Sequence, residues 1–268
     1  MLLTIKHRTT YEYEVDPYRV GLRLMMFPRN LPTQKVQQWA ITVNGELINK
    51  QFENAFGEGE AIWLAYEPET PLELIAEGIF EVKDNSGVVC VSERKAPSEI
   101  FLRQTHLTQP DEAIRKLALG LPSKASLEMA HALSNIISER ILYLPGKTDS
   151  ATTAADVLKN GAGVCQDHTH LMISIAREMG VPARYVVGYL FEPDRKDELR
   201  ETHAWAELQI DGLGWVGFDP SNQVCPTDHY VRLTSGFDAD DAAPISGILV
   251  GTCAETMDVE VSVDCVSQ

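Results

Sequence analysis

The sequence has few features of a membrane-spanning or nucleic-acid-binding protein. It contains no apolar run of the roughly 18 residues that a bilayer-spanning helix needs. Lys and Arg number 23 against 39 Asp and Glu, which gives a formal net charge of −16. Nucleic acids and anionic membranes attract clustered cations, so this balance argues against both as partners. The acidic composition is typical of a soluble protein, and a preference for cationic substrates is the weaker alternative.

Targeting signals and paired cysteines are also missing. The first eight residues lack the apolar core and the small-residue cleavage site of a signal peptide, and they are predicted to form a strand. The cysteines are odd in number and have no CxxC spacing, which indicates reduced thiols rather than disulfides or a zinc site. They are Cys90, Cys165, Cys225, Cys253 and Cys265. We therefore expect a cytoplasmic protein.

Residues 1–97 are predicted to form a β-rich accessory domain. Short segments of alternating polarity are separated by clusters of Pro, Gly and Asn, which is typical of strands joined by turns. The candidate strands are residues 3–7, 10–15, 21–26, 38–43, 61–66 and 72–82. Strands this short and this regularly spaced indicate a sandwich or an open barrel.

Residues 98–268 are predicted to form an α+β domain with a β extension at its C-terminal end. Helices are predicted for residues 98–103, 110–119 and 126–143, and in the last of these apolar residues recur at helical spacing. The stretch after Cys165 is apolar on nearly every face, which is typical of a helix buried at the centre of a domain. Strands are predicted for residues 185–191, 204–210, 215–218 and 257–263.

Cys165 is the candidate nucleophile. It follows the glycine-rich turn Gly161-Ala162-Gly163-Val164 and opens the buried helix. A thiolate is favoured at a helix N-terminus beside a basic imidazole. The backbone N–H groups of that first turn, including the one of Cys165, would face a developing oxyanion.

His203 and Asp219 are the candidate base and its partner. His203 begins an alternating segment, and Asp219 ends the segment Gly214–Asp219. Two antiparallel strands joined by residues 211–214 would place the two side chains together. The carboxylate could then fix the tautomer and orientation of the imidazole. The spacing permits a Cys-His-Asp triad that transfers acyl groups through a thioester.

Five blocks around these residues carry a family resemblance. They are Tyr143–Thr148, Gly163–Asp167, Gly180–Tyr189, Thr202–Trp205 and Gly214–Pro220. In this order they resemble the transglutaminase-like superfamily, in particular its bacterial proteins of the cysteine-protease type. The β-rich N-terminal part also resembles the accessory domain that precedes the core in those proteins. The resemblance implies a papain-like core with the nucleophile helix packed on an antiparallel sheet. It makes Cys165 the nucleophile, His203 the general base and then acid, and Asp219 the residue that orients it.

Other candidate site residues are weaker. Tyr143, Gly163, Gln166 and Trp205 are candidates for substrate or oxyanion contacts, although a core position is favoured for Trp205. Related chains often have Arg where this sequence has Phe237 and Ser246, and the loss of two cations near a cleft would alter the preferred substrate charge. Asp167, His168 and His170 form a poor chelate because residues one or two apart do not share a helix face. No metal or other cofactor is expected.

The leading functional hypothesis is an amide hydrolase of the peptidase or amidase type acting on a peptide or protein. The first alternative is a transglutaminase that transfers the acyl group of a protein glutamine to an amine. An arylamine acetyltransferase ranks below both. The alternative of another class is a non-catalytic binding module that retains the fold. No residue identifies the substrate or the oligomeric state.

Overall fold

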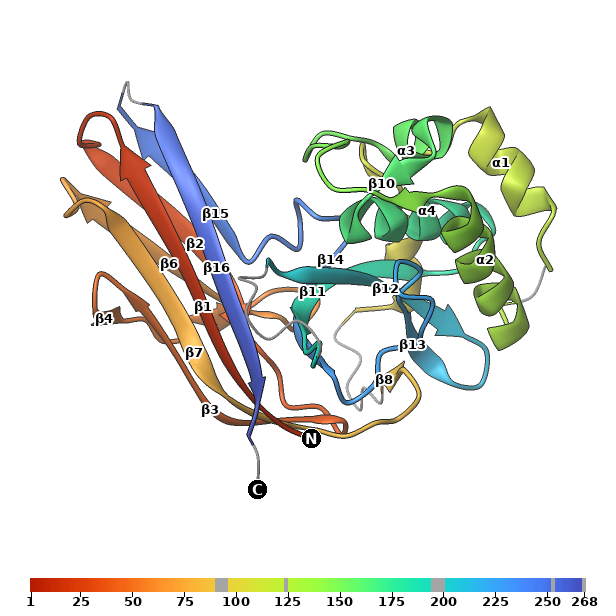
Figure 1. Ribbon diagram of the computed structural model, residues 1–268, viewed down its shortest axis with the longest axis horizontal. Helices are drawn as coiled ribbons and strands as arrows, with labels where there is room; N and C mark the ends of the chain where they lie inside the picture. The colour runs from red at the N-terminus through yellow and green to blue at the C-terminus, as the bar shows by residue number, and fades with distance from the viewer. Residues whose placement is uncertain (90–95, 123–124, 194–200, 252–253, 267–268) are drawn as a thin grey trace.

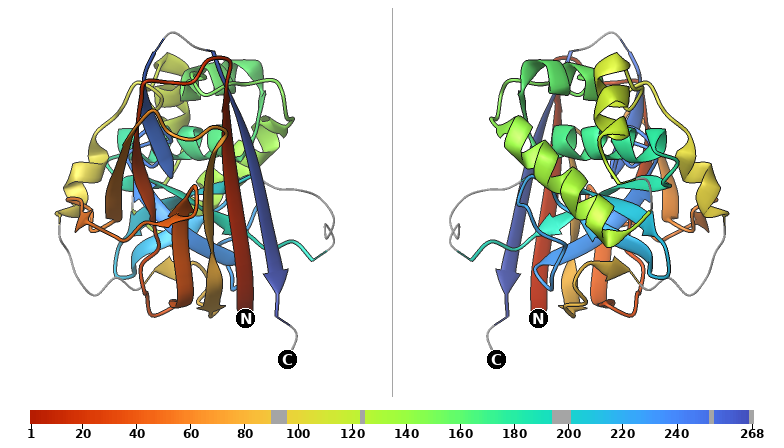
Figure 2. Two further views of the ribbon diagram at one scale, coloured as in Figure 1. Left: turned by 90° about the vertical axis from the view of Figure 1, so that its left-hand side faces the viewer. Right: turned by 90° about the vertical axis from the view of Figure 1, so that its right-hand side faces the viewer.

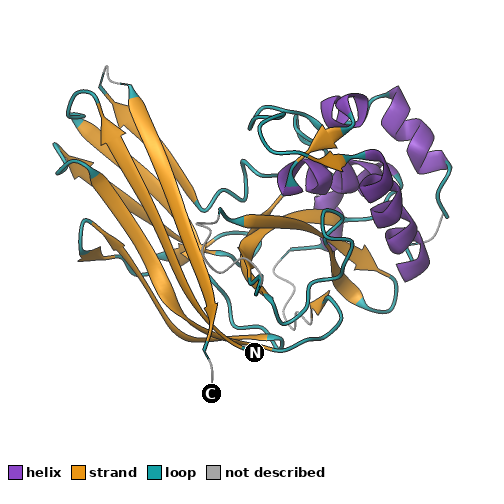
Figure 3. Ribbon diagram, viewed as in Figure 1, coloured by secondary structure: helices purple, strands orange, loops and turns teal. Residues whose placement is uncertain are grey.

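The computed structural model describes residues 1–89, 96–122, 125–193, 201–251 and 254–266. Figure 1 shows long strands on one side of the molecule and a layer of helices over a second, smaller sheet on the other. Strands outweigh helices along the chain (Figure 3). The predicted α+β class, with a β-rich part preceding the helical core, is confirmed.

Two antiparallel sheets form the sandwich. The five-stranded sheet has the order β16 (Glu255–Cys265), β1 (Leu2–Tyr13), β7 (Leu72–Val82), β3 (Gln34–Val43) and β4 (Glu46–Leu47). The four-stranded sheet has the order β15 (Ile245–Val250), β2 (Arg19–Phe27), β6 (Gly59–Tyr66) and β5 (Phe52–Glu53). Alternation along the strands buries one face of each: Leu3 and Ile5 of β1 and Leu22 and Leu24 of β2 all enter the same core.

The C-terminal strands belong to the sandwich. The predicted division at residue 97 grouped them with the helices, but β16 pairs with β1 along its whole length, from Leu3 opposite Cys265 to Tyr13 opposite Glu255. Strand β15, which sequence analysis missed, pairs with β2. The described residues nearest the two chain ends therefore lie side by side, and the N–H of Val266 donates to the carbonyl of Leu2 at 3.0 Å (Figures 1 and 2). Pairing across the length of the chain depends on tertiary structure, so local alternation does not reveal it.

The second unit consists of a five-stranded sheet and its helices. The sheet order is β14 (Tyr230–Gly236), β11 (Ala183–Leu190), β12 (His203–Ile210), β13 (Gly214–Phe218) and β8 (Val88–Val89). The helices are the 3₁₀ turn η1 (Ser98–Leu102), α1 (Glu112–Leu119), α2 (Leu127–Arg140), α3 (Ala154–Asn160) and α4 (Cys165–Glu178). A small parallel pair, β9 (Leu142–Tyr143) and β10 (Ala162–Gly163), precedes α4.

Helix α4 lies between the sheet and the other helices. Its residues from Asp167 to Arg177 are all buried, as the apolar pattern predicted. Leu171 and Ile175 share a core with Ala204 and Ala206 of β12. Because side chains alternate across a strand, Trp205 and Glu207 of β12 point away from α4. Among the described residues, no helix combines the length and the apolarity that crossing a bilayer would need.

Candidate active site

Cys165 is the first residue of α4, as predicted. Val164 before it is extended, and its N–H donates to Asp167 Oδ2 at 2.7 Å, which caps the helix. The Thr148 hydroxyl donates to the same oxygen at 2.7 Å. The Cys165 side chain remains partly exposed. The nucleophile candidate therefore occupies the positive end of a buried helix dipole, at the surface of the core.

Gly163 is required by the close approach of α4. A Cβ at this position would lie 2.6 Å from both Cβ and Oδ2 of Asp167. The Gly163 carbonyl accepts from the N–H of Leu144 at 2.9 Å, which holds the turn against β9. The glycine thus lets the capping carboxylate pack directly against the turn that leads to Cys165.

The structure brings Cys165, His203 and Asp219 together. Strands β12 and β13 form the predicted antiparallel pair, with Ala206 opposite Phe218. His203 Nε2 lies 2.6 Å from Asp219 Oδ2, and the imidazole is also hydrogen-bonded to the thiol of Cys165. Because Nε2 is engaged by the carboxylate, Nδ1 is the ring nitrogen that remains for the sulfur.

The electrostatics of the pair favour a charged imidazole. Burial lowers the pKa of His203, but hydrogen bonds to Asp219 and Cys165 and their negative charges outweigh burial and raise this pKa to about 10. Burial raises the pKa of Asp219, and hydrogen bonds from His203, Ser221 and Asn222 overcome it, so this pKa falls to about 2. Asp219 is therefore a carboxylate, and it holds His203 as an imidazolium beside the Cys165 sulfur.

Three supporting residues of Asp219 were not found by sequence analysis. The backbone N–H and the hydroxyl of Ser221 donate to Oδ1 at 3.0 and 2.6 Å. The side-chain amide of Asn222 and the hydroxyl of Tyr230 donate to Oδ2 at 2.8 and 2.9 Å. The string Asp219-Pro220-Ser221-Asn222 is an Asx-type turn signal that could have revealed the first two. Tyr230 comes from β14, and no local pattern connects it to the site.

The ring of Trp205 packs against the imidazole of His203. Its ring stacks on His203 with centroids 6.3 Å apart and makes an edge contact with Tyr230 at 5.5 Å. Only 2% of Trp205 is exposed. A Cβ on the facing Gly188 would lie 2.6 Å from the indole. The favoured core position describes Trp205 better than a place in a substrate cleft.

The remaining candidates occupy different surroundings. Tyr143 of β9 is exposed and lies opposite Gly163, and its ring centroid is 6.1 Å from that of His168. Gln166 is the second residue of α4 and is partly exposed. Both therefore border the N-terminus of α4, where a substrate carbonyl would approach Cys165.

The two positions that depart from the family pattern do not form a charged cleft. Phe237 packs against Phe56 and Phe101 with centroids 5.1 and 5.5 Å away. The guanidinium of Arg103 lies 5.4 Å from the Phe237 ring. Ser246 is in β15 of the sandwich, opposite Arg23 of β2. The expectation that both positions adjoin the site is thus not met, because one lies in an aromatic cluster and the other in a different sheet.

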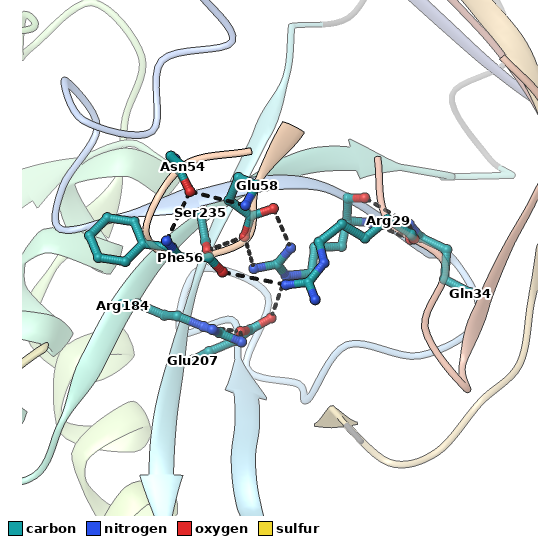
Figure 4. A network of polar contacts seen from close by, with 9 residues as sticks. Arg29, Gln34, Asn54, Phe56, Glu58, Arg184, Glu207 and Ser235 are labelled. Atoms are coloured by element: carbon teal, nitrogen blue, oxygen red, sulfur yellow. Dashed lines mark hydrogen bonds and ion pairs between the residues drawn. The ribbon is translucent and has the colours of Figure 1, made fainter. Parts of the chain in front are cut away.

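A buried ionic network joins the sandwich to the strands that carry the site (Figure 4). Glu58, from the turn before β6, accepts from Arg232 of β14 at 2.8 Å and from the hydroxyl of Ser235 at 2.6 Å. Glu207 of β12 accepts from Arg232 at 3.1 Å and from Arg184 of β11 at 2.6 Å. The network lies on the same strands as His203 and Tyr230, and it balances two cations with two anions.

The histidines near Cys165 have separate partners. His168 contacts two backbone carbonyls, while His170 Nε2 accepts from the N–H of Ala239 at 3.1 Å. Within the described ranges, no three His, Cys, Asp or Glu side chains are grouped so as to hold a metal ion. Cys165, Cys225 and Cys265 are free thiols, and Cys90 and Cys253 lie outside the described residues.

Comparison with known proteins places both parts of the chain. Residues 115–220 match the transglutaminase-like superfamily, and residues 3–81 match the bacterial transglutaminase-like N-terminal region. The crystal structure of a "Putative Cysteine Protease" from Cytophaga hutchinsonii is 24% identical, with a TM-score of 0.74, over 100% of this chain and 92% of that one. At this identity, the likeness establishes the fold.

Relatives in mycobacteria also match. An uncharacterized protein of Mycobacterium leprae is 40% identical over 126 residues, which are 45% of this chain and 44% of that protein. This match thus spans less than half of that relative's length. An uncharacterized protein of Mycobacterium bovis is 29% identical over 98% of this chain and 91% of its own length. The sequence similarity to this relative therefore extends along nearly the whole chain.

Proposed function

The chain belongs to the transglutaminase-like superfamily in its bacterial form, and from this premise we propose that it hydrolyses peptide or isopeptide amides through a thioester on Cys165. The observation that carries the proposal is the continuous hydrogen-bonded series Cys165–His203–Asp219 at the N-terminus of α4. Nucleophile, base and orienting carboxylate within hydrogen-bond reach of one another are the geometric requirement for covalent acyl transfer.

Acylation begins with attack of the Cys165 sulfur on the substrate carbonyl carbon. The thiol proton resides on His203, whose imidazolium Asp219 stabilises. The carbonyl oxygen becomes an oxyanion facing the backbone N–H of Cys165 at the start of α4. When the C–N bond breaks, the leaving amine takes the proton from His203, and the acyl group remains on sulfur as a thioester.

Deacylation uses the same residues in reverse. His203, now neutral, takes a proton from an incoming water while the water oxygen attacks the thioester carbonyl. The C–S bond breaks, the carboxylic acid leaves, and the proton on His203 restores the starting pair with Cys165. Asp219 keeps Nε2 engaged throughout, so Nδ1 remains directed at the sulfur.

Alkylation tests whether Cys165 is an activated thiol. The full chain is treated with iodoacetamide at pH 7, and each cysteine is followed by peptide mass mapping. Burial raises the pKa of Cys225, and Cys265 is exposed, so these two provide internal references for a shielded and an open thiol. We expect Cys165 to react faster than both and to lose that advantage in His203→Ala. A Cys165 rate equal to that of Cys265 would contradict an activated nucleophile.

A peptide library shows whether water or an amine accepts the acyl group from Cys165. The wild-type chain, Cys165→Ala and the control Cys225→Ala are incubated with the library, with and without cadaverine, and products are read by mass. New carboxyl termini that depend on Cys165 support hydrolysis. Products carrying cadaverine instead of water would assign an amine transferase. Bound peptides that Cys165→Ala still retains, with no product from the wild type, would indicate a binding module.

A further inference from the structure

His168 places both of its ring nitrogens against backbone oxygens. Nδ1 is 2.9 Å from the carbonyl oxygen of Val164, and Nε2 is 3.1 Å from that of Ile141. Only 1% of the residue is exposed. A carbonyl oxygen can only accept, and a neutral imidazole carries a single N–H. A neutral ring would therefore leave one buried nitrogen lone pair facing an oxygen lone pair, whereas an imidazolium donates to both.

We propose that His168 donates from both ring nitrogens and thereby positions the backbone N–H of Cys165 toward the oxyanion. The positioning role rests on the proposed function, because that function supplies the oxyanion. The charge of the ring does not depend on it. His168 touches no reacting atom. It acts through the peptide group that joins Val164 to Cys165.

The planarity of that peptide transmits the effect. In a trans peptide the C=O of one residue and the N–H of the next lie in one plane and point in opposite directions. A donor that holds the Val164 carbonyl therefore also sets the direction of the Cys165 N–H. Asp167 holds the other side of Val164 by accepting from its N–H at 2.7 Å. Both polar backbone groups of Val164 are thus held by the first turn of α4: the Asp167 carboxylate accepts from the N–H, and the carbonyl accepts from the backbone N–H groups of Asp167 and His168, at 3.0 and 3.1 Å, as well as from the His168 ring.

The surroundings of His168 can accommodate its charge. The ring of Tyr143 on β9 is inclined at 35° to the imidazole with centroids 6.1 Å apart, within reach of a cation–π contact. On α2, the charged residue next to Ile141 is Arg140, which is exposed. The positive end of the α4 dipole opposes the charge by about 0.3–1 kcal/mol, and the hydrogen bonds from a charged ring to two carbonyls outweigh it.

The two contacts of His168 also connect two helices. Ile141 follows the last residue of α2 as its C-cap, and its N–H donates to the carbonyl of Ile137 at 2.9 Å. The carbonyl of Ile141 faces Nε2 of His168. The start of α4 is therefore tied to the end of α2 through one imidazole. A glutamine carries both of its N–H donors on one nitrogen, so it lacks the two separate donor nitrogens with which the ring reaches Val164 and Ile141.

Nitrogen NMR tests the charge. Histidine-labelled full chain is observed at pH 7, and the His168 signals are assigned by their loss in His168→Gln. We expect two protonated ring nitrogens with near-equal ¹⁵N shifts and slowly exchanging protons, because the ring is buried. One protonated and one unprotonated nitrogen at pH 7 would overturn the proposal. This outcome does not depend on any enzymatic activity.

Kinetics test the positioning role, with p-nitrophenyl acetate as the acyl donor. His168→Gln is compared with His131→Gln, which alters an exposed histidine on α2. Removal of an oxyanion donor lowers kcat by about a hundredfold to a thousandfold. Because His168→Gln only misaligns this donor, we expect kcat to fall by at least about tenfold, with KM within about twofold. Alkylation of Cys165 forms no oxyanion, so its rate should change by less than about threefold. Equal losses in both reactions would show that His168 acts on the thiol or on the fold, which contradicts the proposal.

Failure of the proposed function is distinguishable from failure of this inference. A wild-type chain that forms no Cys165-dependent product from the peptide library would refute the proposed function, and the NMR signals would still decide the charge of His168. Far-UV circular dichroism of His168→Gln shows whether the variant folds. If it does not, the ring signals are assigned in the wild-type chain from the backbone resonances of His168, and the number of protonated ring nitrogens still decides the charge.

Discussion

Replacing Glu58 by Gln should lower the free energy of unfolding far more than the loss of an ordinary surface charge does. Glu58 belongs to the sandwich, is 1% exposed and accepts two hydrogen bonds from Arg232 and one from Ser235. In Glu58→Gln, the buried cations Arg184 and Arg232 share the single anion Glu207. One positive charge is then uncompensated in a site that excludes water.

The expected magnitude follows from that imbalance. Breaking a buried ion pair by removing one partner costs about 3 to 5 kcal/mol, because the remaining charge stays desolvated. The matched control is Glu53→Gln, which breaks the exposed pair with Lys50 and should cost at most about 1 kcal/mol. In the double variant Glu58→Gln/Arg232→Met, the pair Arg184–Glu207 is neutral again. The two changes should therefore be non-additive by about 1 to 3 kcal/mol.

Urea unfolding followed by tryptophan fluorescence measures these free energies. Trp39 and Trp63 report on the sandwich, and Trp205 and Trp215 on the core sheet. A Glu58→Gln variant whose loss equals that of Glu53→Gln would refute the reasoning. Additive effects in the double variant would show that Arg232 is not the group left unpaired.

Three further changes test the site itself. Tyr230→Phe removes one hydrogen-bond donor to Asp219. The pKa of Asp219 is about 2 in the folded protein, below its ordinary value of 3.8. The carboxylate therefore stabilises the fold above about pH 4, and this contribution is lost as the pH falls to about 2. The difference between the free energies of unfolding at pH 6 and pH 2.5 should shrink in this variant, and an unchanged difference would argue against the contact. Gly163→Ala places a methyl group against Asp167, so it should lower the free energy of unfolding by about 1 to 3 kcal/mol and slow the alkylation of Cys165. Gly120→Ala is the control, because Gly120 has ordinary spacing and a negative φ, and it should do neither. Equal melting temperatures for the two variants would contradict the packing argument. The pKa of His203 is raised from 6.5 to about 10, so its stabilising effect is complete below about pH 6.5 and is lost as the pH rises to about 10. The thermal midpoint of the wild type should fall over this window more steeply than that of His203→Gln, and parallel curves would contradict this assignment.

Local patterns predicted much of the core. The glycine-rich turn and the apolar run placed the start of α4 at Cys165, and alternation on both sides of residues 211–214 predicted the hairpin of β12 and β13. These elements are encoded by neighbouring residues, since caps, turns and side-chain periodicity act over a few positions. The predicted helix from residue 126 is α2, capped by Ser126, although it ends at Arg140 rather than Tyr143.

Patterns failed where stability comes from distant partners. Strand β14 carries buried charge in Arg232, so it has no simple alternation of apolar residues, and its place at the sheet edge depends on Glu58 and Gln34 of the sandwich. Strand β15 is a half-exposed edge strand whose only strand partner in the described chain is β2. Neither signal is present in the local sequence.

The sequence by itself determined which chemical groups are available and how each is presented: a thiol at a helix start, an imidazole at a strand start and a carboxylate at a strand end. Tertiary structure alone decided that the three meet, that Tyr230 completes the support of Asp219, and that the C-terminal strands close the sandwich. The physical reason is range. Periodicity and capping reflect interactions within a turn or a strand, whereas hydrogen bonds between strands and compensation of buried charge join residues that only the folded chain brings into contact.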